Sequence, residues 1–100
     1  MFMERDISFY KKWLVNLQHE ALELVGLILK IELLLHENRK VIQLAKELDE
    51  YENPVLANII LNDSKFRNRL KKEIELLDEI DLDISHVEFM IEKLKNQENE

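Results

Sequence analysis

One stretch of the sequence limits what this chain can fold into more than any other. Residues 21–35 read ALELVGLILKIELLL, in which eleven of fifteen residues are aliphatic or alanine and only Glu23, Lys30 and Glu32 are charged. Such a segment favours burial, because exposed apolar surface is unfavourable in water. It is too short and too often interrupted by charge to span a bilayer, which requires about 20 apolar residues. The segment therefore predicts a buried helix of the protein itself.

Apolar residues recur through the first half of the chain at alternating spacings of three and four. The positions of this repeat are Ile7, Tyr10, Leu14, Leu17, Ala21, Leu24, Ile28, Ile31, Leu35, Asn38, Ile42 and Ala45. A heptad pattern of this length predicts long helices packed at a shallow angle. Asp6 or Ser8 can cap the first helix. Because a polar residue occupies the repeat at Asn38, either one helix runs from about residue 7 to 51, or it kinks near Asn38.

The same repeat begins again after Asn53-Pro54. Its positions are Leu56, Ile59, Asp63, Phe66, Leu70, Glu73, Leu77, Ile80, Ile84, Val87, Ile91 and Leu94. Proline is tolerated at a helix start but not inside a helix. We therefore expect one helix to end before Asn53-Pro54 and another to begin there.

Possible caps predict further breaks in the second half. The cluster Asn62-Asp63-Ser64 favours a short helix from Pro54 to about Leu61 and a new helix near Lys65. Asp81 and Asp83 could cap another break. Residues 95–100 contain no apolar side chain, so we expect a frayed tail there.

The composition supports an all-helical fold. One glycine and one proline leave few turn signals for a multi-stranded sheet, and 46% hydrophobic residues are incompatible with disorder. The absence of cysteine excludes disulfides and thiolate metal sites. The chain is therefore predicted to be a single all-α domain over residues 1–100. Long antiparallel helices would form a helical hairpin turned at Asn53-Pro54.

A lone hairpin leaves apolar side chains uncovered, because each helix buries only one stripe. The residues outside the stripe include Leu22, Val25, Leu27, Leu29, Leu33 and Leu34. Either several short helices of the second half wrap around the first, or two chains pair into a four-helix bundle. We favour a homodimer that is antiparallel at Leu24, Ile28 and Ile31. The predicted interface consists of Leu24, Leu27, Ile28, Ile31, Glu32, Leu34 and Leu35.

Glu32 is the unusual member of this predicted interface. On a helical projection it lies inside the apolar sector, on the same side as Val25 and Ile28. A buried carboxylate needs a partner. We expect either a salt bridge to a basic residue of another helix or chain, or a role in selecting one binding partner.

Charge limits the partners that the chain can bind. A net charge of -7 argues against direct binding to nucleic acid or to an anionic membrane. Basic residues cluster over residues 65–72 and acidic residues over 73–83, which predicts helical ion pairs from Arg69 to Glu73 and from Lys71 to Glu75. The first ten residues lack the basic region of a signal peptide, so we expect a cytoplasmic protein.

No residues form a recognisable catalytic, cofactor or metal site. His19, His36 and His86 are far apart, and His19-Glu20 lacks the second histidine of a zinc-protease helix. Carboxylate pairs occur at a spacing of three in Glu20 with Glu23, Glu47 with Glu50, and Glu75 with Asp78. These pairs resemble those of the all-α nucleotide pyrophosphohydrolases. That resemblance implies a magnesium-dependent enzyme as an alternative function.

The leading hypothesis is a small acidic, non-enzymatic module for protein–protein interaction. Such a homodimer would bind another protein through a helix face and act as a regulator, inhibitor or adaptor. A third hypothesis is that the acidic residues between Glu73 and Asp83 imitate a phosphate backbone and occupy a nucleic-acid-binding protein. The sequence does not identify the partner.

Overall fold

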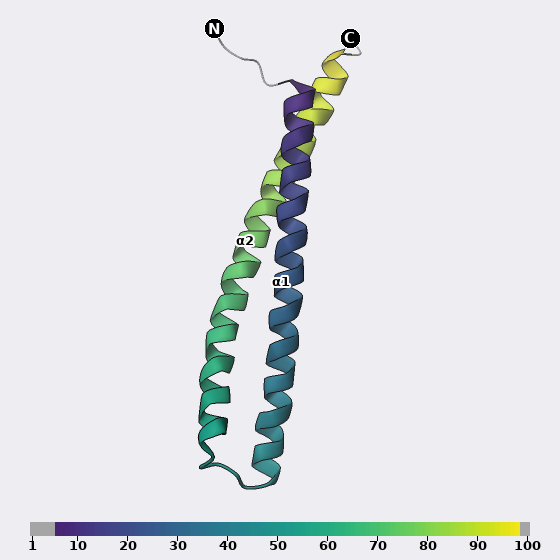
Figure 1. The fold of residues 1–100 in the computed structure, drawn as a ribbon. Coiled ribbons are helices and arrows are strands. Elements are labelled where there is room, and N and C mark those ends of the chain that lie inside the picture. Colours follow the sequence, from purple (N-terminus) through teal and green to yellow (C-terminus); the bar gives the residue numbers. More distant parts are fainter. Residues whose placement is uncertain (1–5, 99–100) are drawn as a thin grey trace. The chain divides into compact units, whose positions relative to one another are not determined.

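Two long helices make up nearly all of the structure. The computed structural model describes residues 6–98, and these contain α1 (Ile7–Glu47), α2 (Pro54–Glu98) and no strand (Figure 1). The predicted all-helical fold is confirmed. α1 continues through Asn38 without a break, as the alternative of one uninterrupted helix predicts.

The breaks predicted near residues 62–64 and 81–83 are wrong, because α2 is continuous across both positions. Asp63 does not cap a new helix; it is buried in the middle of α2 and forms an ion pair with Arg67 one turn later. A residue type that favours caps is thus retained inside the helix by burial and a local partner. The wrapping of α1 by several short helices is therefore excluded over residues 6–98.

Local hydrogen bonds define both ends of α1. The Phe9 N–H donates to Asp6 Oδ1 over 2.9 Å, so Asp6 is the N-cap. At the other end Asp49 adopts a left-handed conformation with φ of 55°. The Glu50 N–H donates to the Ala45 carbonyl over 2.9 Å, which is typical of a Schellman motif. This motif ends α1 at Glu47, earlier than the predicted residue 51.

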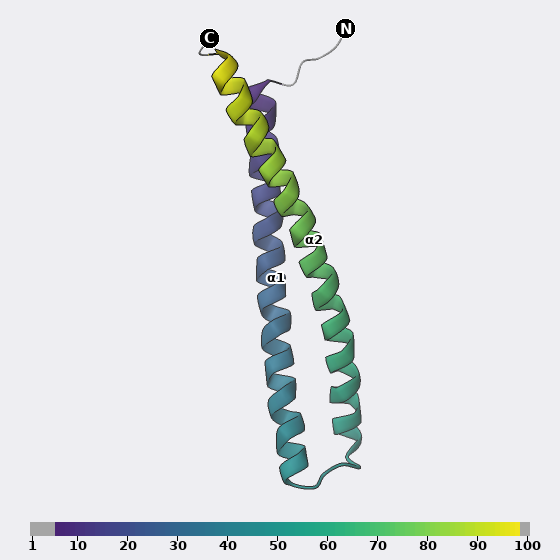
Figure 2. The ribbon, with the colours of Figure 1, turned by 180° about the vertical axis from the view of Figure 1, so that it is seen from behind.

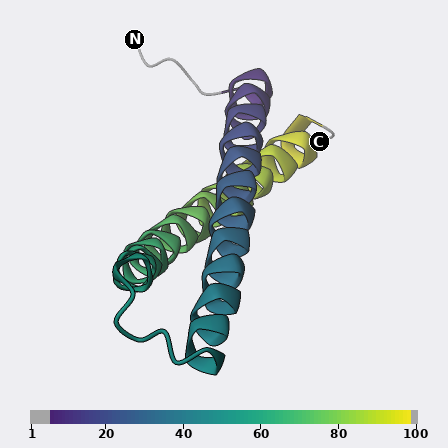
Figure 3. The same cartoon turned by 60° about the horizontal axis from the view of Figure 1, so that its bottom comes forward.

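The second helix begins where the sequence predicted. Asn53 is its N-cap, since its Oδ1 accepts a hydrogen bond from the Val55 N–H over 2.9 Å, and Pro54 is the first helical residue. The connection between the helices comprises residues 48–53, and Figure 3 brings it forward. At the other end α2 reaches Glu98, into the segment predicted to fray. Residues 99–100 lie outside the described part.

The chain divides into two compact units. Unit 1 comprises Met1–Val25 and Leu76–Glu100, of which residues 6–25 and 76–98 are described. In this unit the first part of α1 and the last part of α2 lie side by side and antiparallel (Figure 1, Figure 2). Their buried core consists of Tyr10, Leu17, Ile80, Val87 and Ile91.

Unit 2, Gly26–Glu75, is a helical hairpin formed by the last part of α1, the connection and the first part of α2. Its buried side chains are Ile28, Ile31, Leu35, Leu56 and Asp63. In both units every position of the apolar repeat is buried or half-buried. The single domain over residues 1–100 stays a prediction.

Candidate functional site

The described residues expose more large apolar side chains than they bury. Eighteen large hydrophobic side chains are exposed, whereas nine hydrophobic residues are buried. Single exposed leucines are normal on protein surfaces, but contiguous apolar surface marks a binding site. The arrangement of the exposed residues therefore matters more than their number.

One row of apolar residues follows α1 through unit 2 and is here called the flank row. It consists of Leu27, Leu34, Val41 and Leu48. Residues seven apart lie nearly above one another on a helix, so Leu27, Leu34 and Val41 share one line on α1, and Leu48 follows directly after its end. Leu34, Val41 and Leu48 are 46%, 44% and 63% exposed, and Leu27 is half-buried. On the helix this row adjoins the buried positions Ile31 and Leu35, so it extends the apolar face that already packs inside unit 2.

A second exposed apolar group in unit 2 is shorter. Leu29 and Leu33 are 59% and 61% exposed, and the same side of α1 continues with the exposed polar residues His36 and Lys40. At 100° per residue, Leu29 lies about 140° around the helix from Leu34. This group is therefore separated from the flank row.

The residues predicted for the interface fall into three classes. Ile28, Ile31 and Leu35 are buried inside the chain, Leu24 and Leu27 are half-buried, and Glu32 and Leu34 are exposed. A second chain could not contact the three buried side chains unless unit 2 opened. The apolar repeat of α1 packs first within its own chain, so the free apolar surface lies on its flank. Val41 and Leu48 were not among the predicted interface residues, although they lie seven and fourteen residues after Leu34 on the same flank.

Within the single chain Glu32 is exposed, so the burial predicted for it would require a second chain. No ion pair within residues 6–98 involves it. The helical projection placed Glu32 inside the apolar sector, on the same side as Val25, but Val25 is itself exposed. The buried face of α1 is narrower than the apolar sector of its sequence.

A buried polar layer interrupts the core of unit 2. Asp63 is 7% exposed, and its Oδ2 lies 2.8 Å from Arg67 Nε. Asp63 Oδ1 and Asn38 Nδ2 are both buried without a hydrogen-bond partner among the described residues. Asn38 lies nine residues before Glu47, the last residue of α1. Asp63 lies nine residues after Pro54, the first residue of α2. The two positions therefore correspond in their distance along the chain from the connection, and the side chains offer one donor and one acceptor.

The remaining charged residues lie on the surface. The predicted pair of Arg69 with Glu73 is present at 3.8 Å, whereas Lys71 and Glu75 form no ion pair over residues 6–98. Exposed pairs of this kind contribute about 0–1 kcal/mol. Beyond half-buried Glu73, the acidic residues up to Asp83 are exposed.

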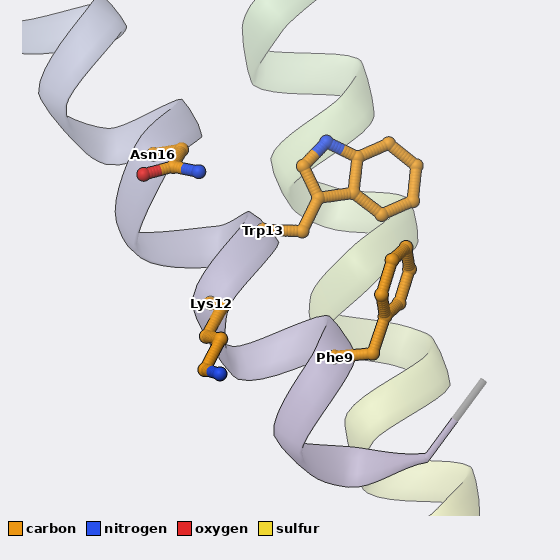
Figure 4. A pocket seen from close by; sticks show the side chains of 4 residues that line it. All are labelled: Phe9, Lys12, Trp13 and Asn16. Carbon is orange, nitrogen blue, oxygen red and sulfur yellow. The ribbon is translucent and has the colours of Figure 1, made fainter.

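The described residues contain no group of three His, Cys, Asp or Glu side chains that could hold a metal ion. The three carboxylate pairs singled out in the sequence are exposed, as are the three histidines. A pocket at the start of α1 is lined by Phe9, Lys12, Trp13 and Asn16 (Figure 4). Its aromatic rings pack with centroids 6.0 Å apart. Lys12 is the only titratable side chain among the described residues that line it, so these four residues offer no pair of groups for acid–base catalysis.

Comparisons with known proteins do not narrow the function. No protein family, curated protein or solved structure matches the chain. Within residues 6–98, neither helix has a stretch long and apolar enough to cross a bilayer.

Proposed function

We propose that this chain is a non-enzymatic protein–protein interaction module that works as a homodimer. The flank row carries the proposal, because its four apolar side chains run along unit 2, three of them are exposed, and charged Lys30 and Glu37 border the row on its solvent side. Burial of such a row against a second helix provides the main driving force for association.

The accessible area of the chain is large enough for a dimer interface. A folded monomer of 12.0 kDa exposes about 6,000 Å², whereas this chain exposes 8202 Å². A standard interface removes about 800 Å² from each partner. One dimer contact would therefore bring the exposed area closer to that of a compact protein.

A dimer formed through the flank row leaves Leu29 and Leu33 for a different partner. These side chains, with a chain charge of -7, suit a partner that presents an apolar helix bordered by basic residues. The dimer would act on that protein as a regulator, inhibitor or adaptor, since no described group of side chains supplies a reaction of its own.

Sedimentation equilibrium at tens of micromolar tests the dimer. We expect a species of twice the chain mass of 12.0 kDa, and a monomer at every concentration would refute the proposal. Affinity capture from the native host, repeated with Leu29→Glu/Leu33→Glu, tests the partner. A captured protein that is lost only with the double variant supports the proposed second surface.

A further inference from the structure

We infer that the homodimer forms by antiparallel pairing of the two flank rows, α1 against the partner's α1, about a two-fold axis between Leu34 and Val41. This inference rests on the proposed homodimer and goes beyond it by naming the surface, the orientation and the register.

The even spacing of the row makes it self-complementary. In a two-fold dimer, if residue i contacts residue j of the other chain, then j also contacts i. With the axis midway between Leu34 and Val41, Leu34 lies opposite the partner's Val41, and Leu27 lies opposite the partner's Leu48. All four residues of the row are used: Leu27, Leu34 and Val41 on α1, and Leu48 directly after its end.

The position of the row on α1 completes a helical bundle. The flank row adjoins Ile31 and Leu35, which are already buried in unit 2. A second helix on the flank row therefore extends the existing core, as in a four-helix bundle, whereas a helix on Leu29 and Leu33 would form a separate contact.

The polar layer of unit 2 lies at the level of the proposed axis. Asn38 is the first residue after the midpoint between Leu34 and Val41. Asp63 lies the same number of residues from the connection on α2. The axis places the polar layers of the two copies side by side. A shift by one heptad would place each layer beside apolar residues of the partner. A buried polar residue that faces apolar residues costs free energy, and buried polar residues specify the register of helical bundles in this way. The polar layer therefore favours the aligned dimer.

Single thiols test the orientation cleanly, because the natural chain has no cysteine. Leu34→Cys and Val41→Cys are oxidised separately and after mixing under conditions that allow subunit exchange. A disulfide requires Cα atoms within about 7 Å. We expect a covalent dimer mainly in the mixture, because the thiols of the two variants face each other only across an antiparallel pair. Leu29→Cys mixed with Leu33→Cys serves as the matched control.

The possible outcomes separate the inference from the function on which it rests. Efficient cross-linking of Leu34→Cys alone would show a parallel pair or another register, and it would overturn the inference while the homodimer stands. A noncovalent dimer without cross-linking in the mixture, or equal cross-linking in the control mixture, would also overturn it. A chain that is monomeric in sedimentation refutes the homodimer itself.

Charged substitutions provide an independent measurement of the same surface. Leu34→Glu/Val41→Glu should weaken the dimer about a hundredfold, since central apolar contacts dominate interface energies. Leu29→Glu/Leu33→Glu makes the same type of change on a similarly exposed surface and should leave the dimer constant within about threefold. Circular dichroism checks that both variants stay helical. The opposite ranking of the two variants would contradict the flank row as the interface.

Discussion

Replacing Asp63 by leucine should stabilise the protein. Asp63 occupies a repeat position of α2, is 7% exposed, and has one carboxylate oxygen without a hydrogen-bond partner among the described residues. Its ion pair with Arg67 connects it to a side chain that is 56% exposed, so solvent screens the attraction. The carboxylate is therefore desolvated with little compensation.

The expected size of the gain follows from four contributions. An unpaired buried acceptor costs about 1–3 kcal/mol, and the substitution removes it. A buried leucine side chain contributes about 1.5–3 kcal/mol. Loss of the ion pair with Arg67 costs about 0–1 kcal/mol, and fitting a larger apolar side chain can cost about 1–3 kcal/mol in strain. The central values of these contributions give a rise in the free energy of unfolding of about 2 kcal/mol, since relief of the unpaired oxygen and leucine burial outweigh the losses.

Equilibrium unfolding in guanidinium chloride measures this change. Wild type and Asp63→Leu are compared at one protein concentration, because dimer formation adds to the apparent stability. Asp63→Asn is the matched control, since it keeps the shape and the polarity and should gain less. A loss of more than about 1 kcal/mol in Asp63→Leu would refute the reasoning, because it would mean that Asp63 belongs to a fully paired network with Asn38.

Three smaller changes test other features. Gly26→Ala should raise the free energy of unfolding by about 0.5–1 kcal/mol, because an added Cβ meets no atom within 4 Å; a decrease in urea unfolding would indicate that another backbone packs there. Asn53→Ala should lower the free energy of unfolding by about 1 kcal/mol through loss of the cap on α2, while Asn53→Asp should retain most of the wild-type stability. Thermal unfolding measures both variants. Glu32→Leu should change stability by less than about 0.5 kcal/mol, since Glu32 is exposed. A loss of several kcal/mol would show that Glu32 is paired in the dimer.

The helix ends could be predicted where one local residue decides them. Asp6 and the pair Asn53-Pro54 cap the helices through hydrogen bonds to residues two or three positions away, and sequence alone contains that information. Similar capping residues at 62–64 did not break α2, because the burial of Asp63 depends on α1 packing beside it. Such tertiary context is not encoded in the residues next to the predicted break.

The candidate surface was predicted only in part, for a related reason. The sequence showed that α1 has more apolar residues than one neighbour can cover, and Leu34 is exposed in the structure. It could not show which apolar residues the chain itself buries. Ile28 and Ile31 were therefore assigned to the interface, and Val41 and Leu48 were not.

The composition of unit 1 has a consequence for the order of folding. Its core joins residues from opposite ends of the sequence, as Tyr10 and Ile91 illustrate, whereas unit 2 joins residues on either side of a short connection. Closing the short loop loses less chain entropy than bringing the two ends together. Contacts near residues 48–53 should therefore form first, and helix pairing should then extend toward the termini. Once the connection has formed, each added layer brings the next pair of residues together, so the distant core of unit 1 need not form by direct encounter of the chain ends.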